Sequence, residues 1–176
     1  ELGTTGSTDS RGYRGGVKPL DVLGVRVEMP TNQPIVLLRE RDGSRHLPIW
    51  IGAAEATAIA YAQQGVTPPR PLTHDLLVKV IRALGHRLER VRIDRLSNGI
   101  FHATLELSGG VEVDSRSSDA IALAIRVGAD VVAPDDLLET AGITITEEAD
   151  VEVERFKEFL DHVSPEDFEH PTRENP

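Results

Sequence analysis

The sequence contains no cysteine, which excludes disulfide bonds, cysteine-ligated zinc and thiol nucleophiles. Long apolar stretches are also missing, since no run reaches the roughly 18 residues that identify a membrane-spanning helix. The start of the chain lacks the basic, apolar and small-residue segments of a secretory signal. These absences predict a cytoplasmic protein that does not enter a membrane.

The length of 176 residues, of which 39% are hydrophobic, suffices for one well-formed core and is short for two. We expect a single domain over residues 17–146. Residues 1–16 lack periodicity and are predicted to be a flexible leader or a cloning remnant. Residues 147–176 are predicted to form an acidic helix and tail. Phe156 and Phe159 give this helix an apolar edge that suits either the body of the protein or a protein partner.

The formal net charge of −10 is concentrated in the C-terminal part of the chain. From residue 134 onward there are 14 acidic and 3 basic residues, whereas residues 1–133 contain 15 acidic and 16 basic residues. A near-neutral body does not exclude nucleic acid as a partner. The seven basic residues from Arg70 to Arg95 form either a phosphate-facing patch or a solvated face.

Hydrophobic periodicity predicts a mixture of strands and helices. Alternation of apolar and polar residues predicts an opening antiparallel meander with strands at 23–29, 35–40 and 45–51. Helical spacing predicts helices over residues 52–64, 73–84 and 118–127, the last of them apolar on nearly all sides and therefore buried. The expected fold class is α+β, a compact mixed domain with antiparallel meanders and packed helices.

A second meander is predicted between residues 88 and 116. Two three-residue loops, at 97–99 and 108–110, connect its three antiparallel strands. The resulting register pairs Ile93 with Ala103, Asp94 with His102, Leu105 with Val113, His102 with Arg116, and Glu106 with Glu112. This register separates apolar from charged residues, and Arg90 is expected to relieve the repulsion between the two facing glutamates.

Thr73, His74 and Asp75 stand where the second predicted helix begins. Thr73 is expected to be the N-cap, and Asp75 suits the positive end of the helix dipole and can pair with Lys79 four residues later. His74 has no such structural explanation, and a histidine at this place can be a proton shuttle or a metal ligand. The apolar positions 76, 77, 80, 81 and 84 of the same helix form one stripe.

Arg116, Ser118 and Asp119 lie where a strand passes directly into the third predicted helix. In one interpretation Ser117 or Ser118 caps the helix, Asp119 stabilises its positive end, and Arg116 belongs to a solvated strand face. In the other interpretation the helix start is a phosphate site. Backbone N–H groups and Arg116 then bind the anion, and Asp119 binds a metal or a water molecule.

Glu55 is the only acid in a predicted helix of small and apolar residues. A buried carboxylate needs a partner, and Arg116 or Arg70 can supply a structural ion pair. Alternatively, Glu55 joins Asp75 and Asp119 around a divalent cation such as Mg²⁺, which prefers carboxylates and water as ligands. The sequence does not decide between these two roles.

Three motifs occur in a defined order. They are Leu-Pro-Ile-Trp-Ile-Gly at 47–52 with Glu55-Ala56, Arg-Pro-Leu-Thr-His-Asp-Leu at 70–76, and Arg116 followed by Ser-Asp-Ala-Ile-Ala-Leu-Ala at 118–124. Through them the chain resembles the bifunctional nuclease family of small bacterial and plant domains, over about residues 20–146. Ser117 stands where that family more often has proline. The resemblance implies a compact α+β fold, a homodimer, and activity on both DNA and RNA.

The resemblance thus implies a nuclease that hydrolyses phosphodiester bonds in DNA or RNA. Such chemistry usually uses one or two metal ions, for which Mg²⁺ or Mn²⁺ are the candidates here. The residues assigned to substrate binding are Arg116, Arg70 and Ser118, the one assigned to acid–base catalysis is His74, and those assigned to holding a metal or orienting water are Glu55, Asp75 and Asp119. The sequence has no His-Glu-x-x-His motif, no Asp-x-Asp pair and no glycine-rich phosphate loop. Any active site must therefore be assembled from distant motifs.

The alternative hypothesis is a non-catalytic interaction or regulatory module. In this interpretation the body is a dimer, the polar motifs are helix caps and salt bridges, and the acidic C-terminal helix binds another protein. Trp50 then anchors the core or the dimer rather than stacking on a base. The two hypotheses differ in whether the motif side chains line one open cleft.

Overall fold

The computed structural model describes residues 16–145, and most of the expected leader and the C-terminal helix lie outside these residues. The elements in chain order are β1 (Val17–Glu28), β2 (Gln33–Glu40), β3 (Arg45–Trp50), α1 (Ala53–Gln63), α2 (Thr73–Ala83), β4 (Leu88–Ser97), β5 (Ile100–Leu107), β6 (Val111–Arg116), α3 (Ser117–Val127), β7 (Asp130–Pro134), α4 (Asp135–Ala141) and β8 (Ile143–Thr144). This mixture confirms the α+β class. Within the described residues, no helix has the length and apolar character needed to cross a membrane.

The strands form a single sheet with the order β6-β5-β4-β7-β1-β2-β3-β8. Both predicted meanders are present, β1-β2-β3 at one side and β4-β5-β6 at the other. Strand β7 lies between them and joins them, because it pairs antiparallel with β1 and parallel with β4. The two meanders therefore share one hydrophobic core.

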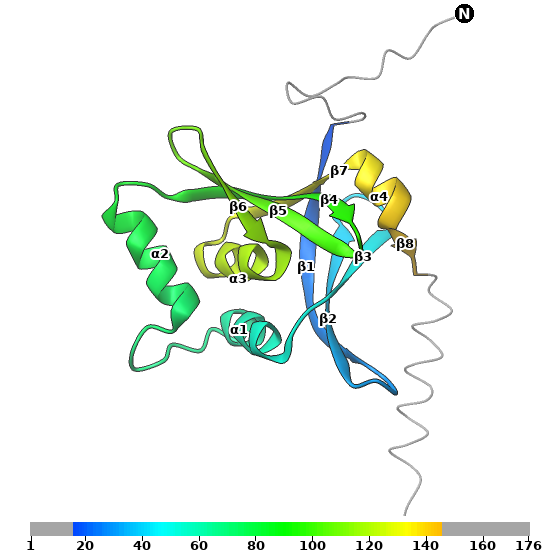
Figure 1. Ribbon diagram of the computed structural model, residues 1–176, viewed down its shortest axis with the longest axis horizontal. Helices are drawn as coiled ribbons and strands as arrows, with labels where there is room; N and C mark the ends of the chain where they lie inside the picture. Colours follow the sequence, from blue (N-terminus) through cyan, green and yellow to red (C-terminus); the bar gives the residue numbers. More distant parts are fainter. Residues whose placement is uncertain (1–15, 146–176) are drawn as a thin grey trace, which may run out of the picture. The chain divides into compact units, whose positions relative to one another are not determined.

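Helix α3 lies against the β4-β5-β6 meander, with α1 beside it and α2 on its outer side (Figure 1). Residues Ala120 to Ala124 of α3 are completely buried, which confirms the burial predicted for this helix. They pack with Val91, Ile93 and Leu105 of the sheet in one core cluster. Helix α4 packs separately against β3, β4 and β7.

The second meander has the predicted register except near its first turn. Ile93 opposes Ala103, but His102 opposes Arg95, so the predicted pairing of His102 with Asp94 is wrong. The turn contains two residues rather than three, because Asn98 and Gly99 both have positive φ, 50° and 75°, as a type I′ turn requires. A bulge between Ile93 and Arg95 compensates for the shorter loop.

Helix α2 departs from its predicted start and packing. Thr73 is not the N-cap, because the helix begins at Thr73 and Leu72 occupies the cap position. The backbone N–H of Leu72 donates to a carboxylate oxygen of Asp75 at 3.0 Å, which is one half of a capping box. Most of the apolar stripe of α2 is exposed rather than buried in the core: within it only Ile81 packs against the core cluster, and Val78, outside the stripe, is the buried residue of the helix.

Candidate active site

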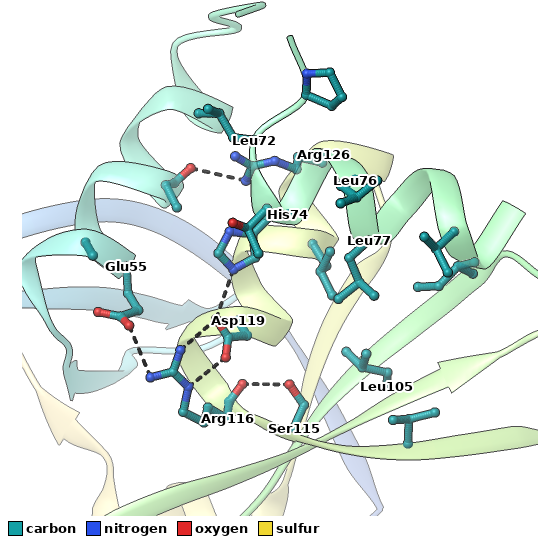
Figure 2. A pocket seen from close by; sticks show the side chains of 18 of the residues that line it. Glu55, Leu72, His74, Leu76, Leu77, Leu105, Ser115, Arg116, Asp119 and Arg126 are labelled. Atoms are coloured by element: carbon teal, nitrogen blue, oxygen red, sulfur yellow. Dashed lines mark hydrogen bonds and ion pairs between the residues drawn. The ribbon is translucent and has the colours of Figure 1, made fainter.

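A cleft of about 1340 Å³ opens between α1, α2, the start of α3 and the β5-β6 hairpin. One end of the cleft is polar and contains Glu55, His74, Arg116 and Asp119, which we call the polar cluster (Figure 2). These four residues come from α1, α2, the end of β6 and α3. The fold therefore gathers parts of all three sequence motifs in one cleft.

The four side chains form a continuous chain of contacts. The imidazole Nε2 of His74 lies 2.9 Å from Oδ1 of Asp119. Arg116 donates to both carboxylate oxygens of Asp119, from Nε at 2.7 Å and from Nη2 at 3.1 Å. Its Nη1 lies 3.1 Å from Oε1 of Glu55. The proposed pairing of Glu55 with Arg116 is confirmed, whereas the link between His74 and Asp119 had no counterpart in the sequence analysis.

Arg116 is the exposed member of the polar cluster. Its side chain is 65% exposed, whereas that of His74 is only 14% exposed. The hydrogen bonds that Arg116 donates to Asp119, together with that carboxylate's charge and the contact with Glu55, raise the pKa of Arg116 above its ordinary value. A guanidinium has five N–H groups, of which Asp119 and Glu55 occupy three. The remaining N–H groups can bind an anion that enters the cleft.

The contact with Asp119 selects one tautomer of His74. Burial raises the pKa of Asp119, but hydrogen bonds from Arg116 and His74 outweigh burial and leave that pKa below its ordinary value. Asp119 is therefore an ionised acceptor at neutral pH, and Nε2 of His74 carries the donated proton. In the neutral ring Nδ1 is then a proton acceptor, and it makes no hydrogen bond with any of residues 16–145. A carboxylate that orients a histidine in this way is typical of catalytic acid–base pairs.

A low-pH measurement tests the ionisation of Asp119. Because the folded protein holds this pKa below the ordinary value of 3.8, the unfolded chain binds more protons near pH 4, and the free energy of unfolding falls as pH falls through this range. We expect Asp119→Asn to have a flatter dependence than the wild type in urea unfolding between about pH 5 and pH 3. Asp42→Asn, in an exposed turn, is the matched control. An unchanged slope in Asp119→Asn would contradict the ion pair.

Asp75 belongs to a second cluster, behind α2, and does not line the cleft. Its Oδ1 accepts a hydrogen bond from Nε of Arg126 at 2.8 Å, so the predicted pair with Lys79 is replaced by one with α3. Arg126 Nη1 also donates to the backbone oxygens of Ala58 at 3.1 Å and Ala122 at 2.9 Å. Burial raises the pKa of Asp75, but the hydrogen bonds from Arg126 and the Leu72 backbone lower it below its ordinary value.

Sequence reasoning did not single out Arg126. The available signal was its position as the only basic residue in a helix predicted to be buried, because a buried guanidinium needs hydrogen-bond acceptors. In the structure Arg126 joins α1, α2 and α3, and we call this contact set the Arg126 clamp. The clamp thus links α2, the helix that carries His74, to α1 and α3.

Two residues assigned to substrate binding do not line the cleft. Ser118 is buried and Arg70 is exposed, and neither contributes to the cleft lining. The predicted serine cap is also wrong, because Arg116 occupies the N-cap position of α3 and makes no side-chain cap hydrogen bond. The basic stretch from Arg70 to Arg95 is not one patch, since Arg92 is buried and forms an ion pair with Glu106.

Two further expectations concern Trp50 and the facing glutamates. Trp50 is not a core residue, because it is half exposed and its indole Nε1 donates to Glu28 at 2.8 Å. Glu106 opposes Glu112 as predicted, and Arg90 binds Glu106 at 2.6 Å. The repulsion between the two glutamates is therefore relieved in the predicted way.

The acids assigned to a metal do not converge in this arrangement. Glu55 and Asp119 both face Arg116, whereas Asp75 faces Arg126 behind the helix. Among residues 16–145, no three histidine, cysteine, aspartate or glutamate side chains form a group that could hold a metal ion. The carboxylate set expected for Mg²⁺ or Mn²⁺ thus does not fit a preformed metal centre.

Much of the remaining lining of the cleft is apolar, although Thr57, Thr73, Asp114, Ser115 and Arg126 also line it. Side chains that protrude from α2 form one side, which we call the apolar wall: Leu72, Leu76, Leu77, Val80 and Leu84. Each of them is between 39% and 73% exposed. Leu105 of β5 and Val113 of β6 line the opposite side of the same cleft. The polar cluster therefore lies at the end of an apolar groove.

Comparisons with known proteins give the family. The sequence model of the bifunctional nuclease domain matches residues 36–146. Two proteins of Mycobacterium tuberculosis, from strains CDC 1551 / Oshkosh and ATCC 25618 / H37Rv and both described as uncharacterized, are each 53% identical over 156 residues, covering 84% of this chain and 95% of theirs. The resemblance carried by the three sequence motifs is confirmed, and the chain belongs to the bifunctional nuclease domain family.

Proposed function

We propose that the protein hydrolyses phosphodiester bonds of DNA or RNA at the polar cluster. Membership of a nuclease family supports this function. The observation that carries the proposal is the arrangement around Asp119, whose carboxylate contacts His74 on one side and the exposed Arg116 on the other. A proton acceptor and an anion-binding group are thereby held at the same end of one cleft.

Each residue of the cluster has a defined part in the reaction. The free N–H groups of Arg116 bind the nonbridging oxygens of the phosphate and stabilise the charge that builds up on them. Nδ1 of His74 takes a proton from the attacking water as the water oxygen bonds to phosphorus. The bond from phosphorus to the leaving sugar oxygen breaks, and that oxygen is protonated by solvent. Asp119 stabilises the resulting imidazolium, and Glu55 holds Arg116 in place.

No step of this mechanism passes through a metal ion. The carboxylates of Glu55 and Asp119 already pair with Arg116, so a cation bound there would compete with the guanidinium for them. The cleavage assay therefore includes Mg²⁺, Mn²⁺ and EDTA, to measure whether the activity depends on a divalent cation.

The test is cleavage of end-labelled DNA and RNA oligonucleotides by wild type and by Arg116→Ala. We expect the variant to lose about 100-fold or more in rate, because it removes the group that stabilises the developing phosphate charge. Arg87→Ala is the matched control, since the Arg87 side chain is 75% exposed and lies outside the cleft. Equal cleavage by wild type and Arg116→Ala would reject the proposed site.

A second candidate function is a non-catalytic dimeric interaction module. It is supported by the mutual pairing of the charges in the polar cluster and by the exposed apolar wall beside them. Under this alternative the purified wild-type protein cleaves no oligonucleotide under any of the metal conditions, and it sediments as a dimer. Reproducible cleavage that is lost in Arg116→Ala would reject it.

A further inference from the structure

The apolar wall exposes hydrophobic side chains to water, which is energetically unfavourable unless a ligand or partner covers them. Its five side chains protrude from one helix, although α2 already buries Val78 on another side to anchor itself. A soluble protein rarely exposes a continuous apolar surface without a partner for that surface. The wall therefore indicates a ligand with an apolar face.

The position of the wall restricts what that ligand can be. Leu76 and Leu77 face the same cleft as His74 and Arg116, and Leu105 lies across the cleft from α2 (Figure 2). A molecule bound here would thus meet an apolar surface and a guanidinium within one groove. A nucleotide has this pairing of properties, because its base presents a flat apolar face and its phosphate is an anion.

The distribution of charge argues against a duplex as that ligand. Duplex DNA carries one negative charge per roughly 1.7 Å of its axis, and proteins that hold it present many cations to the backbone. The cleft is lined by two arginines only, and Arg126 is 10% exposed and held by the clamp. Arg116 is thus the one exposed cation among the described residues that line the cleft.

The accessibility of the bases also distinguishes single-stranded nucleic acid from a duplex. In a duplex both faces of each base are covered by neighbouring bases, so they cannot contact a protein wall without unpairing. In a single strand the bases can turn outward and lie on protein side chains. Resting on the function proposed above, we infer that the cleft selects single-stranded nucleic acid, with a phosphate at Arg116 and an unstacked base against the apolar wall of α2.

Equilibrium binding measured by fluorescence anisotropy in EDTA tests this inference without turnover. Three labelled probes of equal length are compared: a single strand, the corresponding blunt duplex, and a single strand with abasic sites in place of its bases. We expect the wild type to bind the single strand at least about tenfold more tightly than either other probe, because only that probe brings both a free base and a phosphate.

A variant of the wall separates base binding from phosphate binding. Leu76→Gln is expected to weaken binding of the single strand by about fivefold to tenfold and to leave binding of the abasic strand unchanged. Leu76 is 52% exposed, so the change does not open the core. Ile100→Gln is the matched control, because Ile100 is 62% exposed and does not line the cleft.

Three results would overturn the inference. One is equal binding of the single strand, the duplex and the abasic strand, and another is failure of all three to bind. The third is a wild-type dimer that Leu76→Gln dissociates while single-strand binding stays unchanged, which would assign the wall to a second copy of the chain. The proposed function is judged separately by the cleavage assay, so an enzyme that cuts duplex and single strand equally would retain that function and lose this specificity.

Discussion

Replacing His74 with glutamine is expected to lower the rate of phosphodiester cleavage by about 10²- to 10⁴-fold, the usual contribution of a general base. The side-chain amide of glutamine can still donate a hydrogen bond to Asp119, which His74 contacts at 2.9 Å. It cannot accept the proton of the attacking water. The substitution therefore removes the proposed proton acceptor while Arg116, the group proposed to bind the phosphate, keeps its own contacts with Asp119.

The measurement is single-turnover cleavage of a labelled oligonucleotide as a function of pH. The pH dependence that a general base gives to the wild-type rate should be absent in His74→Gln. Substrate affinity should stay within about twofold, because Arg116 is retained. His46→Gln is the matched control, since that ring lies outside the cleft and contacts the Ser44 carbonyl. A variant with the wild-type rate and pH profile would remove His74 from the mechanism.

The parts of the fold that the sequence predicted well are those fixed by local pattern. The register of β5 and β6 follows from alternating side chains and a loop rich in glycine, and it is observed without a shift. The β4-β5 turn was predicted less well, because a two-residue turn with a bulge and a three-residue turn without one give the same pairing of Ile93 with Ala103. The choice between them depends on the positive φ of Asn98, which alternation does not reveal.

The parts that could not be predicted depend on contacts between distant segments. The stripe on α2 has the spacing of a buried helix face, yet it lines an open groove, because helix periodicity shows that one face is apolar and not what covers it. The same limit applies to β7, whose pairing with both β1 and β4 joins residues far apart in the chain. The pattern of residues within one segment does not show which distant segments it contacts.

In the candidate site, too, some contacts could be expected from the sequence and others could not. The proximity of Glu55 and Arg116 was a reasonable expectation, because a carboxylate in an apolar helix needs a cation. Asp75 does not join Glu55 and Asp119 for a geometric reason: it follows His74 directly on α2, and consecutive side chains of a helix point in different directions. His74 therefore reaches Asp119, while Asp75 reaches Arg126 on another side.

Arg126→Met is expected to cause a large loss of stability, about 2 to 3 kcal/mol in the free energy of unfolding. The guanidinium is 10% exposed, and its removal leaves the partly buried carboxylate of Asp75 and the carbonyl of Ala58 without this donor. Methionine fills much of the same volume, so the loss arises from polar contacts rather than from a cavity. Urea unfolding at pH 7 measures it, with Arg39→Met, a half-exposed surface arginine, as the control expected to stay within about 0.5 kcal/mol.

A double substitution separates two effects of Arg126→Met: the cost of leaving the Asp75 carboxylate without its cation, and the loss of the contacts that link the three helices. In Arg126→Met with Asp75→Asn, the neutral amide no longer needs a counterion but can still accept the Leu72 backbone hydrogen bond, so part of the lost stability should return. If the clamp positions α2, the double variant should nevertheless cleave more slowly than wild type, because His74 would no longer be held against Asp119. Amide hydrogen exchange should then be faster in α2 than in β4 and β5. Recovery of stability with full activity and unchanged exchange would show that the clamp only neutralises Asp75, and that contacts other than those of Arg126 position His74.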